Sequence, residues 1–92
     1  MKELSCTGIV ETFEISGSSE GKQGWFKLEQ AVVTLDSGNH TETQYGVSID
    51  FVNESQDMKT SIELSPQSAK RLADIIQTAL SRGAKMGILR QD

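Results

Sequence analysis

The C-terminal third of the chain has the strongest pattern, an amphipathic helix with one apolar stripe. Ser65 and Pro66 suit the N-cap and the first helical position, where the missing N–H of proline costs nothing. Apolar residues then recur at steps of three and four: Ala69, Leu72, Ala73, Ile75, Ile76, Ala79 and Leu80. Arg82 and Gly83 are typical of a helix end. The pattern predicts a helix over 66–82, and its stripe must be buried against another element.

Four strands are expected before this helix. Apolar and polar residues alternate over 45–52 and over 58–64, and the polar loop between these segments predicts an antiparallel hairpin. Two more strands are expected over 4–15 and 25–35. The apolar residues of the first change phase, and a β-bulge near residues 8–11 would repair the register.

We therefore predict a two-layer α+β fold, a four-stranded antiparallel β-meander with the C-terminal helix packed on one face (β-β-β-β-α). The chain has 92 residues, which is enough for one domain over residues 1–92. Segment 16–24, rich in glycine and serine, is expected to be a flexible loop. Residues 84–92 are expected to form a C-terminal tail. An open meander leaves two edge strands, so association with a second copy is expected.

Composition excludes several classes of protein. No apolar run approaches the roughly 18 residues that a membrane span needs, and we expect no signal peptide and a cytoplasmic location. One cysteine and one histidine cannot form a zinc site alone. Asp and Glu number 13 against 9 Lys and Arg, which argues against general nucleic-acid binding. We expect no metal, no cofactor, no membrane association and no direct nucleic-acid contact.

Cys6 and His40 are the candidates for chemistry. A catalytic thiol needs a nearby base, and His40 is the only histidine. Cys6 shares the phase of Leu4 and Val10, however, which favours a buried, small hydrophobic residue. His40 lies in a turn cluster, where a solvated histidine is the simpler interpretation. We therefore assign no catalytic residue.

Four apolar residues are candidate partner contacts. Trp25 stands beside Phe26, and adjacent strand residues point to opposite faces, so Trp25 is expected outside if Phe26 is inside. Tryptophan is enriched at interface hot spots. Met86, Ile88 and Leu89 lie in the tail, where chains are normally polar. These three either pack back on the domain or dock on a partner.

Charge is divided along the chain. Residues 1–64 contain 4 basic and 11 acidic residues, net −7, whereas residues 65–92 contain 5 basic and 2 acidic residues, net +3. Solubility and cations near a helix C-terminus explain this most simply. The alternative is that an acidic sheet meets a basic surface, which belongs to a second copy, another protein or a nucleic-acid-binding site.

The helix start carries a family resemblance. A strand pair over 45–64 is followed by Ser65-Pro66-Gln67-Ser68-Ala69-Lys70-Arg71-Leu72. This arrangement resembles a family of small bacterial proteins of unknown function, in which a strand pair precedes a helix that opens Ser/Thr-Pro-x-x-Ala-Lys-x-Leu. The resemblance extends from Tyr45 to Leu80 and implies a strand-strand-helix unit. It transfers no site residue.

Three functions are compatible with these patterns. The first is a small, soluble, non-catalytic binding or regulatory module that acts through protein–protein contacts, as a homodimer or with another protein. The second is an acidic inhibitor that mimics nucleic acid, of the kind carried by phages and mobile elements. The third is a small enzyme with its site in a dimer cleft. The first is favoured because no catalytic constellation is recognisable.

Overall fold

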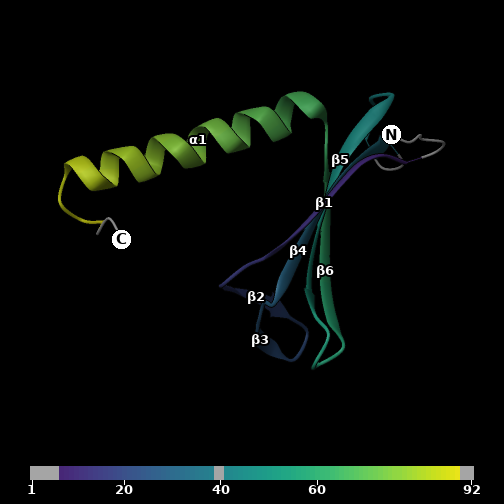
Figure 1. Cartoon of the computed structure of the whole chain (residues 1–92), viewed down its shortest axis with the longest axis horizontal. Helices are drawn as coiled ribbons and strands as arrows, with labels where there is room; N and C mark the ends of the chain where they lie inside the picture. The colour runs from purple at the N-terminus through teal and green to yellow at the C-terminus, as the bar shows by residue number, and fades with distance from the viewer. Residues whose placement is uncertain (1–6, 39–40, 90–92) are drawn as a thin grey trace.

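The computed structural model describes residues 7–38 and 41–89. Within these ranges the elements are β1 (Thr7–Glu14), β2 (Ser18–Gly21), β3 (Gly24–Lys27), β4 (Gln30–Ser37), β5 (Tyr45–Asn53), β6 (Met58–Leu64) and α1 (Pro66–Lys85). Strands β1, β4, β5 and β6 form an antiparallel sheet in that order, and α1 follows its last strand (Figure 1). The predicted α+β class, with a four-stranded antiparallel meander and a C-terminal helix, is confirmed.

The sheet has one apolar face and one polar face. Residues paired directly across antiparallel strands point to the same side, and Val33 is paired with both Glu11 and Ile49. Extending this register gives the apolar face: Ile9, Phe13, Ala31, Val33, Leu35, Val47, Ile49, Phe51, Met58, Ile62 and Leu64. Among the described strand residues of this face, Glu11 alone is charged. The opposite face carries mostly hydroxyl, amide and charged side chains.

A register irregularity in β1 lies at Gly8, inside the segment where a bulge is expected. The pairing with β4 shifts between Thr7 and Ile9. A Cβ at Gly8 would lie 2.7 Å from the backbone oxygen of Leu35, so only glycine fits this close approach. The irregularity brings Ile9 and Phe13 onto the apolar face and leaves Val10 on the polar one.

A second, two-stranded sheet interrupts the meander and differs from the sequence prediction. Segment 16–24, expected to be a flexible loop, contributes β2 and the start of β3, which pair in a tight hairpin. The strand expected over 25–35 is divided into β3 and β4. The hairpin rests on the apolar face, because the Ser19 hydroxyl donates to Thr60 Oγ1 (3.2 Å) and Phe26 is 7% exposed.

Helix α1 begins as predicted but covers less of the sheet than expected. The Ser65 hydroxyl accepts the Ser68 N–H at 3.2 Å, which caps the first turn. The helix axis then leaves the sheet, and Figure 1 shows most of α1 extending to one side of it. The four large stripe residues, expected to pack on the sheet, are 41–53% exposed: Leu72, Ile75, Ile76 and Leu80.

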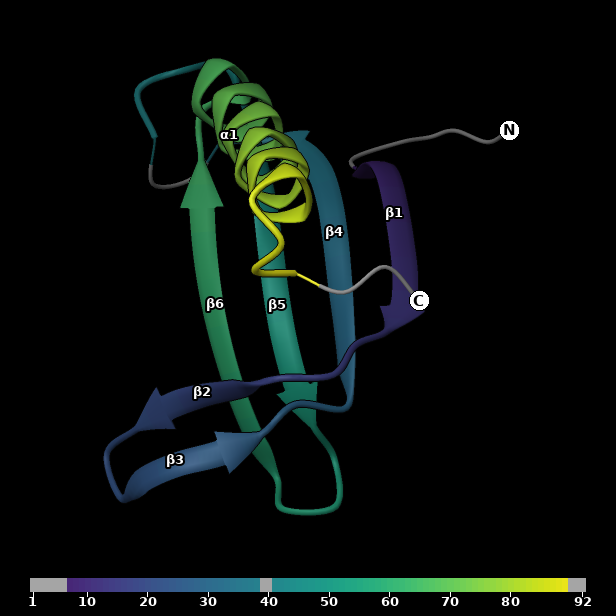
Figure 2. The ribbon, with the colours of Figure 1, turned by 90° about the vertical axis from the view of Figure 1, so that its left-hand side faces the viewer.

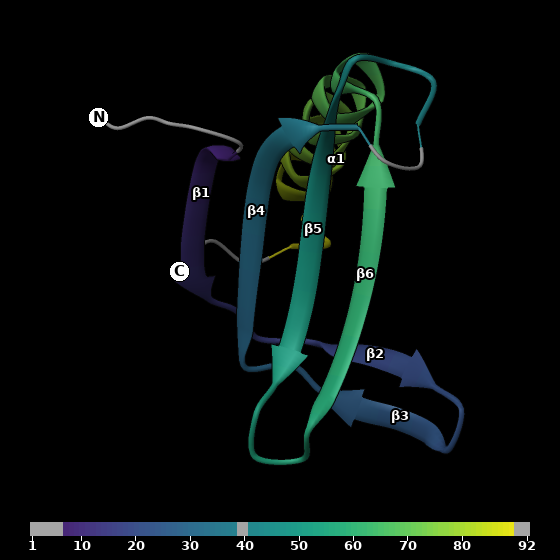
Figure 3. The ribbon, with the colours of Figure 1, turned by 90° about the vertical axis from the view of Figure 1, so that its right-hand side faces the viewer.

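Helix α1 and the β2–β3 hairpin lie on the same side of the sheet. Figure 2 shows both in front of the strands, and Figure 3, from the opposite side, shows both behind them. The Ser19–Thr60 hydrogen bond identifies this side as the apolar face. The chain therefore has the form of an L whose two arms are the sheet and the helix.

Candidate interaction surface

The main feature on the inner side of the L is apolar surface that the single chain leaves uncovered. The helix stripe comprises Ala69, Leu72, Ala73, Ile75, Ile76, Ala79 and Leu80. All residues of α1 from Lys70 to Arg82 are exposed. On the sheet, Ile9 is 54% exposed and Phe13 is 47% exposed. Half-exposed apolar residues on two adjoining surfaces are unusual for a monomer and typical of an interaction site.

The helix stripe points toward the inner side of the L. At about 100° per residue, every stripe residue lies within roughly 80° of Gly83 around the helix axis. A Cβ at Gly83 would lie 3.5 Å from Leu89 Cβ, so the tail covers this point of the stripe. Figures 1 and 2 both show the tail beneath the helix, on the side toward the hairpin. The stripe upstream of Gly83 therefore faces the space between helix and hairpin.

The uncovered part of the sheet includes its β1 edge, and the β4 side chains beside it are half-buried or buried. Helix α1 approaches the sheet at β5 and β6, and the hairpin closes the lower end through Thr60 and Met58. On this face Ile9 and Phe13 of β1 are 54% and 47% exposed. Tyr45 at the start of β5 and Ile62 of β6 are also exposed, whereas Ala31 of β4 is fully buried. We call the helix stripe and the β1–β4 half of the apolar face, taken together, the open surface.

The residues predicted as partner contacts are exposed. Trp25 is 70% exposed on the hairpin, on the side opposite Phe26, as the alternation predicts. In the tail, Met86 and Ile88 are 68% and 76% exposed. Leu89 turns back on the helix, with its N–H donating to the Gly83 carbonyl at 3.2 Å. A contact role for these four residues stays a prediction, and Cys6 and His40 lie outside the described residues.

Charges flank the helix stripe. Helix α1 carries four cations and one carboxylate, net +3, and Lys70 pairs with Asp74 at 2.8 Å. Arg71 and Arg82 lie on the same flank of the stripe, about 100–120° from its centre. On the sheet, Glu11 is exposed within the open surface. The helix is thus net basic, and the described part of the open surface on the sheet contains one carboxylate, Glu11.

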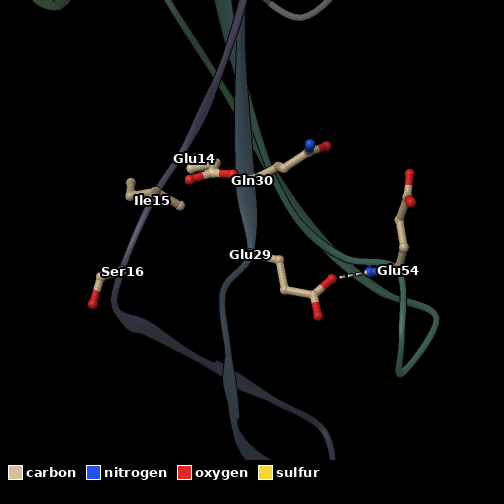
Figure 4. A pocket seen from close by; sticks show the side chains of 6 residues that line it. All are labelled: Glu14, Ile15, Ser16, Glu29, Gln30 and Glu54. Carbon is tan, nitrogen blue, oxygen red and sulfur yellow. Dashed lines mark hydrogen bonds between the residues drawn. The ribbon is translucent and has the colours of Figure 1, made fainter.

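A cleft of about 560 Å³ lies at the lower end of the sheet and is lined by Glu14, Ile15, Ser16, Glu29, Gln30 and Glu54. Figure 4 shows the Glu29 carboxylate turned toward the backbone of Glu54. Its Oε1 accepts the Glu54 N–H at 3.0 Å, and its Oε2 accepts the Ser55 hydroxyl at 2.8 Å. The Ser55 hydrogen bond lowers the pKa of Glu29. These two hydrogen bonds of the Glu29 carboxylate stabilise the β5–β6 turn.

Asn53 joins the same turn to the hairpin. Its side chain is buried, with Nδ2 donating to the Lys27 carbonyl at 2.8 Å and Oδ1 accepting the Gln56 N–H at 2.9 Å. Asp57 completes the turn in the left-handed region, at φ 55°. Of the residues that line the cleft, Glu29 therefore serves the chain reversal through its carboxylate and Glu54 through its backbone N–H.

The part of the chain that the structure describes bears on two kinds of site, a metal centre and a membrane span. In residues 7–38 and 41–89 no group of three His, Cys, Asp or Glu is arranged to hold a metal ion. No helix in these ranges is long and apolar enough to cross a membrane. Sequence patterns identified the stripe as apolar, but they placed it in the core. Its exposure, and that of Ile9 and Phe13, depends on the direction of the helix.

The chain belongs to DUF6295, a family of unknown function whose model matches residues 5–89. The match contains the whole span over which the helix-start motif resembles a small uncharacterised family. No curated protein and no solved structure shows a significant match. Family membership therefore assigns no activity, ligand or site.

Proposed function

We propose that this protein is a small non-catalytic binding module that acts through protein–protein contacts, with a second copy of the chain as its first partner. The observation that carries the proposal is the open surface, in which a half-exposed helix stripe adjoins a half-exposed sheet face. Covering these side chains yields about 25 cal/mol for each Å² of apolar surface removed from water. A protein partner supplies that cover.

The chemistry of the open surface favours this function over the two alternatives. A mimic of nucleic acid needs an ordered array of carboxylates, whereas the open surface is apolar and contains one carboxylate, Glu11, among its described residues. An enzyme needs a group poised for proton transfer or attack. The Glu29 carboxylate already accepts two hydrogen bonds in a turn. Both alternatives stay hypotheses.

Association of the full chain tests the proposal. Light scattering at micromolar concentration should report a mass above that of one chain. Ile76→Asp, which places a charge at the centre of the helix stripe, should reduce that mass to one chain. Ser81→Asp adds the same charge on the opposite side of α1 and should leave the mass unchanged. Circular dichroism shows whether each variant is folded, and Leu80→Ser repeats the test with a milder change.

Two results would contradict the proposal. One is a native chain that stays monomeric and does not bind a dye for exposed apolar surface, because the stripe would then be covered within the chain. The other is an equal loss of association in Ile76→Asp and Ser81→Asp, because contact through the stripe predicts a difference between them.

A further inference from the structure

We propose that two copies associate reciprocally, each laying its α1 across the β1–β4 half of the partner's apolar face. The inference rests on the proposed function and specifies its geometry. Within each chain, α1 approaches β5 and β6 and leaves Ile9 and Phe13 uncovered. A helix with its side chains is about 10 Å wide, which is about two strand spacings. One partner helix therefore fits the uncovered half of a four-stranded face.

A helix from the same chain cannot reach this position. Ser65 is the single residue between β6 and α1, with an extended backbone, and Pro66 has a fixed φ. So short a connection determines the direction in which α1 leaves the sheet. The helix stripe and the apolar sheet face meet at the corner of the L. Two chains of this shape can therefore pack together about a two-fold axis, with the helix of each on the sheet of the other. Each then contributes a stripe and receives one.

The exposed area matches what a stable dimer buries. The chain exposes 7365 Å², whereas a compact monomer of this mass exposes about 5,300 Å². Its radius of gyration is 15.5 Å, against about 12.3 Å for a compact chain of this length. The excess of about 2,000 Å² is larger than the roughly 800 Å² that each partner buries in a standard interface.

Charge favours a second copy as the occupant. The helix is net +3, and the sheet half that receives it contains Glu11 as its exposed charge. As part of the proposed arrangement, we place the flank of the partner helix that carries Arg71 and Arg82 toward β1. Glu11 then has a cation to pair with when the surface is covered, which a buried carboxylate requires. Each chain carries both the cations of α1 and the carboxylate of Glu11, so two identical chains have complementary charges at this contact.

Crosslinking between two variants tests the placement. In a Cys6→Ser background, Ile76→Cys chains are mixed with Val33→Cys chains and treated with a short bis-maleimide. The proposal predicts covalent dimers that contain one chain of each kind. Ser81→Cys chains mixed with Val33→Cys chains provide the control and should give few such dimers. As a second measurement, Glu11→Arg should weaken the dimer by about tenfold or more, whereas Glu14→Arg, on the polar face, should not.

The outcomes separate this inference from the proposed function. If native dimers form but Ile76→Cys chains link only to one another, α1 pairs with the partner's helix. The reciprocal placement is then wrong and the binding function stands. Equal crosslinking of the Ser81→Cys control would also overturn the placement. A chain that is monomeric at every concentration would overturn both the placement and the second copy as partner.

Discussion

Phe26 and Trp25 are neighbours on β3 with opposite surroundings, and truncating Phe26 should destabilise the fold far more than truncating Trp25. Phe26 is 7% exposed between the hairpin and the sheet, and Trp25 is 70% exposed. Removing a buried phenylalanine side chain costs about 3–5 kcal/mol, so Phe26→Ala should destabilise by about 3 kcal/mol because the small hairpin can partly collapse. Trp25→Ala should cost less than about 1 kcal/mol. A domain of 92 residues has about 5–14 kcal/mol in total.

Urea and thermal unfolding followed by circular dichroism measure both variants. A loss of 3 kcal/mol in a chain of this size lowers the melting temperature by roughly 12–24 °C. All samples need one protomer concentration, because association makes apparent stability depend on concentration. A Phe26→Ala variant within 1 kcal/mol of the native chain would refute the hairpin as part of the core. A Trp25→Ala variant as unstable as Phe26→Ala would refute the assigned faces of β3.

Three further changes test the turns and the irregularity in β1. Asn53→Ala removes a buried side chain with two hydrogen bonds and should destabilise by about 1–3 kcal/mol in urea unfolding; a smaller loss would mean that the hairpin is not held there. Gly8→Ala places a Cβ 2.7 Å from the Leu35 oxygen and should cost about 1–3 kcal/mol, and an unchanged midpoint would exclude that close approach. Ser55→Ala should raise the pKa of Glu29 in an NMR titration, because its hydroxyl stabilises the carboxylate. Since that pKa is lowered in the folded state, this contribution to stability is present at neutral pH and is lost as pH falls through the lowered value; a Glu29 titration unchanged by Ser55→Ala would contradict the assigned cause.

The sequence predicts the elements of this fold better than their arrangement. Ser65 and Pro66 define the helix start by local hydrogen bonding, which needs no tertiary information. The alternation in β5 and β6 likewise identifies the apolar face. The β2–β3 hairpin is missed because its strands are four residues each and rich in glycine and serine, so they have no clear alternation. Its stability comes from contacts distant in sequence, above all the burial of Phe26 against the sheet.

The candidate surface could be predicted in composition but not in location, for a physical reason. An apolar stripe predicts that one face of a helix is buried. The sequence pattern is the same whether that face packs on the chain's own sheet or on another chain. What decides between them is the direction of α1, which depends on the single residue Ser65 between β6 and the helix. An extended backbone at Ser65 directs the axis of α1 away from the sheet, so most of the stripe does not reach the apolar face. In the dimer that we propose, the apolar residues that the sequence pattern assigns to one core are shared between two chains.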